Sequence, residues 1–169
     1  RPQAPQAEQQ ERRPRQQGAT KAILSGAGAR GRLPMPILLC SEYYQVEYDD
    51  GRDLIIIRRS ALPMVGPSEA ADAFEQLLRT VRKYAGRPAL VDLRRVPGNN
   101  DAHYEAAIKP YLARLRDNFS MTARVVQTAT GRLQVQRMAR ERGDQSNSVF
   151  TDEDEALAFL LANRDRAGR

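Results

Sequence analysis

The sequence predicts an α/β domain with a mixed, mostly parallel sheet of five strands, an N-terminal β-hairpin and four helices. Two observations predict this class. First, from residue 54 to residue 162, short apolar runs alternate with longer segments whose apolar residues recur at helical spacing. Second, the two strands that follow each other directly are joined by Asp-Asp-Gly at residues 49–51, a typical hairpin turn. Strands that alternate with helices are joined by right-handed crossovers, which make them parallel neighbours.

The hairpin is predicted to contain two strands of different burial. In the first, Tyr44, Val46 and Tyr48 alternate with polar residues, which indicates an antiparallel edge strand with one buried face. In the second, residues 54–57 read Leu-Ile-Ile-Ile, which is apolar on both faces and typical of a central strand. Residues 58–67 contain two prolines and a glycine and are predicted to form a loop.

The first two helices are predicted on either side of a short strand at residues 90–93. The first begins at Ser68, its predicted N-cap, and is ended by Gly86. The second is capped by Asp101, and Pro110 is predicted to kink it. The apolar residues at helical spacing are Phe74, Leu77, Leu78, Val81 and Tyr84 in the first helix, and Tyr104, Ala107, Ile108, Tyr111, Leu112 and Leu115 in the second.

The remaining elements continue the same alternation. Residues 121–127 are predicted to form a strand, and Thr-Gly at residues 130–131 opens a third helix that ends at Gly143. Val-Phe at residues 149–150 is a short strand. The last helix follows Asp-Glu-Asp-Glu at residues 152–155, which resembles a capping box, and it continues to residue 162.

Positive charge is concentrated at the N-terminus. The net charge is +6, and residues 1–36 hold seven basic and two acidic residues, whereas the other 133 residues hold 20 basic and 19 acidic ones. Residues 1–36 lack periodic apolar positions and are predicted to be a disordered basic extension. Residues 37–162 form the predicted domain, and residues 163–169 a frayed C-terminal tail. Because the domain is nearly neutral, no nucleic-acid partner is predicted for it; a basic arm that touches nucleic acid or an acidic partner is the alternative for the extension.

The residue types of common catalytic and metal sites are scarce. His103 is the only histidine and Cys40 the only cysteine, too few for a structural zinc site, and His103 falls in the exposed first turn of a predicted helix. Asp92 and Asp101 are a candidate Mg²⁺ pair, but a strand-end role and a helix cap explain them better. We therefore predict a protein that is not an enzyme and has no catalytic residues, metal or cofactor.

The apolar runs and the cysteine content of the sequence predict the cellular location of the protein. No apolar run approaches the roughly 20 residues that a membrane-spanning helix needs. The single cysteine cannot form an internal disulfide, as expected for a reduced cytosolic thiol. We predict a cytoplasmic protein without a membrane span.

Polar residues after two of the predicted strands form the candidate binding site. In α/β folds, sites are usually built where strands end and helices begin. Residues 128–132 follow a strand and open a helix, whose free N–H groups attract anions. Capping and surface ion pairs are the purely structural alternative. The candidate partner- or ligand-binding residues are Arg94, Arg95, Asn99, Asn100, Asp101, Thr128, Thr130 and Arg132.

The segment Asp-Leu-Arg-Arg-Val at residues 92–96 resembles the Asp-Leu-x-x-Val segment of STAS domains, the anti-anti-sigma factor family. Leu-Gln-Val-Gln-Arg at residues 133–137, and Phe-Thr-Asp-Glu at 150–153 with Ala-Leu-Ala-Phe-Leu at 156–160, are similar to the STAS/SEC14-like group of bacterial proteins. The resemblance covers about residues 37–162. It implies a small, non-catalytic regulatory module.

In anti-anti-sigma factors, a serine near the start of the helix after the Asp-Leu strand is phosphorylated. The resemblance places that position at Asp101, and residues 96–118 contain no Ser or Thr. We therefore expect a STAS-like regulatory or protein-interaction module without the usual phosphorylatable serine, acting on an unidentified protein partner. The alternative is a module that binds a small anionic or lipid-like ligand beside the loops at the carboxyl ends of the strands.

Overall fold

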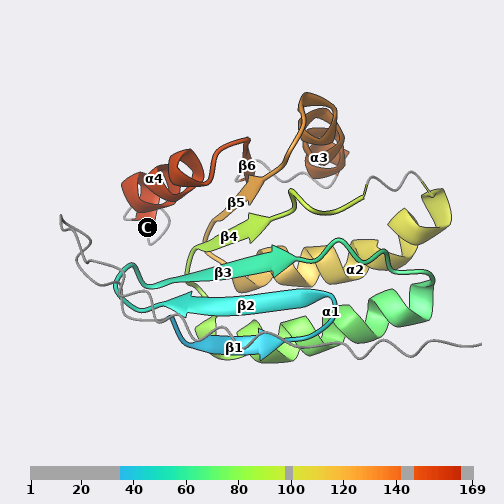
Figure 1. The fold of residues 1–169 in the computed structure, drawn as a ribbon, viewed down its shortest axis with the longest axis horizontal. Helices are drawn as coiled ribbons and strands as arrows, with labels where there is room; N and C mark the ends of the chain where they lie inside the picture. Colours follow the sequence, from blue (N-terminus) through green and yellow to red (C-terminus); the bar gives the residue numbers. More distant parts are fainter. Residues whose placement is uncertain (1–34, 98–100, 142–146, 165–169) are drawn as a thin grey trace, which may run out of the picture. The chain divides into compact units, whose positions relative to one another are not determined.

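A mixed sheet of six strands lies at the centre of the structure, a computed structural model in which residues 35–97, 101–141 and 147–164 are described (Figure 1). These residues fall in the second of two units into which the chain divides, residues 33–169. The strands lie in the sheet in sequence order. They are β1 (Ile37–Cys40), β2 (Tyr44–Asp49), β3 (Leu54–Arg59), β4 (Ala89–Asp92), β5 (Thr122–Val125) and β6 (Asn147–Phe150).

The α/β class and the mixed sheet are confirmed, but the predicted number of five strands is wrong, because β1 adds a sixth. β1 pairs antiparallel with β2 at the edge of the sheet, so β2 is not the edge strand that was predicted, because it lies between β1 and β3. The register of β1 shifts between Ile37 and Leu39. Its sequence is Ile-Leu-Leu-Cys, and both end residues are exposed. An apolar run without polar alternation, on a strand with one neighbour, has no period-2 signal, so the sequence did not reveal it.

The strands from β3 to β6 are parallel, and their register aligns residues on one face. Ile57 of β3 lies opposite Val91 of β4, which lies opposite Arg124 of β5, which in turn lies opposite Val149 of β6. Since side chains alternate along a strand, these four residues point to the same face of the sheet. Arg124 is therefore a charged residue in a row of apolar ones.

Four helices cover the two faces of the described sheet, as predicted. They are α1 (Pro67–Val81), which continues into a 3₁₀ turn, α2 (Ala102–Asn118), α3 (Ala129–Glu141) and α4 (Glu153–Asn163). α1 and α2 pack side by side on one face (Figure 1), where Phe74 and Leu77 meet Ile55 and Ile57 of β3. α4 packs on the other face, against β4, β5 and β6. The sheet is thus enclosed between two apolar cores.

The helix ends follow from local chemistry. Asp101 caps α2 by accepting a hydrogen bond from the His103 backbone N–H at 2.9 Å, and Asp152 caps α4 by accepting one from the Glu155 backbone N–H at 2.9 Å. Both caps agree with the sequence prediction. The cap predicted at Ser68 is wrong: α1 begins at Pro67, with Gly66 at its N-cap and no side-chain cap. Proline suits the first helical position, because its fixed φ is helical and it has no N–H to satisfy.

Asp53 connects the turn between β2 and β3 to two distant segments. Its backbone has a φ of 50°, and its carboxylate accepts hydrogen bonds from the Tyr48 hydroxyl at 2.7 Å, from Arg87 and from Arg164 at 2.9 Å. The hydrogen bonds from Tyr48 and Arg87 hold the pKa of Asp53 below its usual value. The carboxylate therefore stabilises the fold in its charged form.

Replacing Asp53 with asparagine is expected to lower the free energy of unfolding at pH 7 by about 1 kcal/mol, because the charged acceptor is lost and the left-handed backbone is tolerated. The stabilisation from a lowered pKa is present above the pKa of the unfolded chain and is lost as the pH falls through the folded-state pKa. Urea unfolding of both proteins should therefore show a difference at pH 7 that shrinks at acid pH. A difference that is constant with pH would contradict the electrostatic origin.

Candidate functional site

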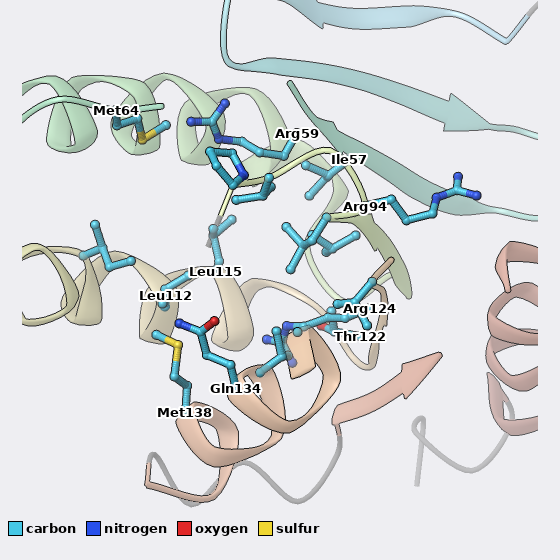
Figure 2. Close-up of a pocket in the computed structure, with 18 of the residues that line it drawn as sticks. Ile57, Arg59, Met64, Arg94, Leu112, Leu115, Thr122, Arg124, Gln134 and Met138 are labelled. Carbon is cyan, nitrogen blue, oxygen red and sulfur yellow. The ribbon is translucent and has the colours of Figure 1, made fainter. Parts of the chain in front are cut away.

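A cavity of about 680 Å³ lies between α2 and α3 and reaches the sheet face that carries Val91 and Arg124 (Figure 2). Loops after β3, β4 and β5 complete its walls. Its size falls within the range of roughly 300–1,000 Å³ that is typical of small-molecule sites. Its apolar lining residues include Ile57, Met64, Val91, Ile108, Leu112, Leu115, Val126, Val135 and Met138.

Side chains from α2 and from α3 form two facing walls of the cavity. On α2, Leu112 and Leu115 of the predicted apolar stripe line the cavity. On α3, Gln134, Val135 and Met138 line it, and Ala139 is the one fully buried residue of that helix. Figure 2 shows Leu112 and Leu115 on one side and Gln134 and Met138 on the other. The apolar stripe of α2 thus packs against α1 on one side and borders the cavity on the other.

Arg124 gives the floor of the cavity a positive charge. It lies in the middle of β5, it is half-buried, and it extends from the sheet toward α3 in Figure 2. Its neighbours in the sheet at this level are Val91 and Val149. Sequence reasoning missed this residue. The available signal was a charged residue between Ala123 and Val125, both of which are fully buried on the opposite face.

Arg59 places a second guanidinium at another part of the lining. It is 8% exposed, and its Nη1 and Nη2 donate to the backbone oxygens of Tyr43, Ser60 and Leu62 and to the Ser60 hydroxyl, at 2.7–3.3 Å. The rings of Tyr43 and Tyr44 lie 4.9 and 5.5 Å from the guanidinium carbon. Among the described residues Arg59 forms no ion pair with a carboxylate. Its charge therefore adds to the positive potential of the lining, while its hydrogen bonds hold the loop after β3.

That loop is also fixed to the start of α1. The Tyr43 hydroxyl donates to Glu69, and the Val65 backbone N–H donates to the other carboxylate oxygen of Glu69 at 2.5 Å. The hydrogen bond to Glu69 raises the pKa of Tyr43 to about 12. Met64, which lines the cavity, is carried by this loop, and the Tyr104 hydroxyl donates to its sulfur at 3.4 Å. This wall of the cavity is therefore fixed by Arg59, by Glu69 and by Tyr104.

The predicted site residues divide into three groups. Arg94, Thr128 and Thr130 line the cavity. Arg95 and Arg132 are exposed and lie outside the lining, and Asp101, also exposed, caps α2. Asn99 and Asn100 lie outside the described residues.

The two threonines begin α3 at the edge of the cavity. The Thr128 hydroxyl accepts a hydrogen bond from the Gly131 backbone N–H at 3.0 Å, which caps the first turn. α3 begins at Ala129, one residue earlier than the sequence indicates. Thr128 therefore caps a helix and also lines the cavity, and Thr130 lines the cavity from the first turn of the same helix.

Arg94 turns its charge away from the cavity into an ion cluster (Figure 2). Its backbone N–H and Nε donate to Asp92 Oδ1 at 3.0 Å, and its Nη2 donates to Asp92 Oδ2 at 2.7 Å and to Glu153. Arg58 donates to Asp92 at 3.1 Å and to Glu153 at 2.8 Å. This ion cluster of four residues joins β3, β4 and the first turn of α4.

The charges of the ion cluster stabilise one another. Burial alone would raise the pKa of Asp92, but the hydrogen bonds from Arg94 and the charge of Arg58 outweigh it and lower the pKa. The hydrogen bond from Arg58 likewise lowers the pKa of Glu153. Asp92 therefore acts as a structural anchor for the loop after β4, whose residues Leu93 and Val96 line the cavity.

The structure also shows where the other reactive residue types lie. His103 is exposed in the first turn of α2, and Cys40 is exposed on β1. In the described part of the chain, no group of three or more His, Cys, Asp or Glu side chains is arranged to hold a metal ion. The described helices contain no stretch that is long and apolar enough to cross a membrane.

The chain matches no protein-family model and no curated protein sequence.

Proposed function

We propose that the domain is a non-catalytic binding module that takes a small amphipathic anion into the cavity between α2 and α3. The observation that carries the proposal is the combination of apolar walls with a cationic lining. The charged lining residues are Arg59, Arg94, Arg116, Arg124 and Glu105. Arg94 directs its charge into the ion cluster and Arg116 pairs with Asp117 at 2.8 Å, so Arg59 and Arg124 supply the positive charge of the cavity. An apolar ligand body gains about 2.5 kcal/mol for each 100 Å² that leaves water, and the excess of positive charge favours an acidic group.

The lining also supports a binding role rather than a chemical one. Among the described lining residues, Glu105 is the one carboxylate, and it pairs with Arg137 at 3.4 Å. The lone His103 is not part of the lining, and of the lining tyrosines Tyr44 is buried while the Tyr104 hydroxyl donates to the Met64 sulfur, so neither is poised as a general acid or base. These placements favour a module that holds its ligand unchanged.

Arg124 is the residue we expect to recognise the acidic group. Two dyes of similar shape test this: 1-anilinonaphthalene-8-sulfonate is an anion, and N-phenyl-1-naphthylamine lacks the sulfonate. Both should bind the full chain and fluoresce. Arg124→Met should weaken the anionic dye about tenfold or more, the value of a hydrogen bond to a charged group, and should change the neutral dye little.

Fluorescence titration with both dyes, supported by circular dichroism to confirm folding, measures this difference. Arg132→Met is a matched control, because Arg132 is exposed on α3 and lies outside the lining. Failure of the wild-type chain to bind either dye would contradict the proposal. An equal loss for both dyes in Arg124→Met would contradict the role assigned to Arg124.

A second candidate is a STAS-like interaction module that acts through a protein partner. It rests on the resemblance of residues 92–96 and on the exposed position of Asp101 at the start of α2. A fixed carboxylate there would replace a switchable phosphoserine. The two candidates predict different results, because a module that acts only through its surface has no need to bind either dye in the cavity.

A further inference from the structure

We infer that the ion pair between Glu105 of α2 and Arg137 of α3 is a latch that holds the proposed ligand in the cavity. This inference rests on the proposed binding function and adds a control of ligand release. Arg137 Nη2 lies 3.4 Å from Glu105 Oε1. Glu105 itself lines the cavity, so the pair joins the two helices that form its opposite walls.

The other walls leave α3 as the element that moves. β3, β4 and β5 are joined by continuous backbone pairing, and α2 packs against α1. The loop after β3 is held by Arg59 and Glu69. α2 and α3 each have one buried residue, Ile108 and Ala139. Ile108 belongs to the apolar core that α2 shares with α1, whereas no residue of α3 belongs to either apolar core, and the inner side of α3 faces the cavity. Elements with few buried apolar contacts open at the lowest cost, so a ligand would leave by displacement of α3 from α2.

The solvent exposure of the ion pair is consistent with a latch. The Glu105 side chain is 22% exposed and that of Arg137 is 54% exposed, so the pair lies where the cavity meets solvent. Surface ion pairs are weak and are screened by salt. The latch therefore tunes the rate of release rather than sealing the cavity.

The test is the dissociation rate of the neutral dye N-phenyl-1-naphthylamine from the full chain, measured by stopped-flow dilution. Arg137→Gln and Glu105→Gln should each speed release about two- to fivefold, the value of an exposed ion pair. The double variant should release the dye no faster than Arg137→Gln alone, because the two changes break the same interaction. High salt should speed release from the wild type toward the same rate.

Two matched controls separate the latch from other effects. Arg140→Gln removes the same charge from the exposed side of α3, and Glu141→Gln breaks the other ion pair of Arg137, at 3.2 Å. Both should release the dye at the wild-type rate.

The outcomes distinguish the latch from the binding proposal. If the dye binds normally but Arg137→Gln and Glu105→Gln behave like the two controls, or the double variant shows additive effects, the latch is wrong and the binding site stands. If the wild type binds no dye, the binding proposal fails and the latch fails with it.

Discussion

Replacing Val135 with tryptophan is expected to abolish dye binding, with a loss of affinity of at least about a hundredfold, while the chain stays folded. Val135 lines the cavity from α3, and Leu112 and Leu115 line it from α2. The indole ring would occupy the space that the ligand needs and would contact the apolar walls. Because the new side chain buries apolar surface in an existing cavity, thermal unfolding should occur at the same or a higher temperature.

The control for this prediction lies two residues away on the same helix. Leu133 is 64% exposed and is absent from the lining, so Leu133→Trp adds the same ring to the outer side of α3. It should bind both dyes as the wild type does. Fluorescence titration and thermal unfolding of the two variants check the prediction. If Val135→Trp still binds with wild-type affinity, the dyes occupy some other surface and the cavity is not the site.

Replacing Asp92 with asparagine is expected to give the largest loss of stability, about 2–3 kcal/mol. Asp92 is 7% exposed and accepts hydrogen bonds from Arg58 and Arg94. Removing its charge leaves Arg94 with Glu153 and leaves Arg58 with Glu153 and the more distant Glu47, at 4.0 Å. Removing one partner of a buried ion pair is costly. Asparagine keeps the size of the side chain, so the effect reports on charge rather than on packing.

The pH dependence of this effect has a defined sign. The pKa of Asp92 is lowered in the fold, so its contribution is complete above the pKa of the unfolded chain, about 3.9. The contribution is lost as the pH falls through the lower folded-state pKa. Urea unfolding should therefore show wild type and Asp92→Asn converging in strongly acidic buffer. Asp154→Asn, at an exposed position in the first turn of α4, should change stability by less than about 0.5 kcal/mol. A loss for Asp92→Asn no larger than this control would show that the ion cluster does not hold the loop after β4.

Much of the fold could be predicted because its elements have clear periodicity. The alternation of Tyr44, Val46 and Tyr48 and the helical stripe of α1 are visible in the sequence, and the described structure contains both elements. β1 was missed because its segment Ile-Leu-Leu-Cys has neither the polar alternation of β2 nor the run of β-branched residues that marks residues 54–57 as a strand. The start of α1 was misplaced because a serine after a proline looks like a cap, whereas the proline itself occupies the first turn.

The candidate site was predicted only in part. The missing part depends on how distant helices pack, whereas the errors in the fold came from local sequence signals. The strand-end rule located Arg94, Thr128 and Thr130 beside the cavity. It did not reveal that Leu112 and Val135 face an open space, because an apolar stripe predicts burial without stating what the stripe faces. That depends on the distance between α2 and α3, which no local pattern encodes. Arg124 was missed because a single charge inside a strand is ambiguous until its register neighbours are known.

The sequence order of the six strands affects where the described part of the chain has room for a ligand. Open α/β sheets commonly place ligands at a topological switch point, where the strand order reverses and two loops part to form a crevice. The described sheet runs from β1 to β6 without a reversal, so each crossover moves in the same direction and the loops do not diverge in this way. In the described residues, the cavity lies instead in the gap between two neighbouring helices, α2 and α3, on one side of the sheet. The volume of such a gap can change through the tilt or side chains of α3 alone, while the backbone pairing of the sheet stays the same.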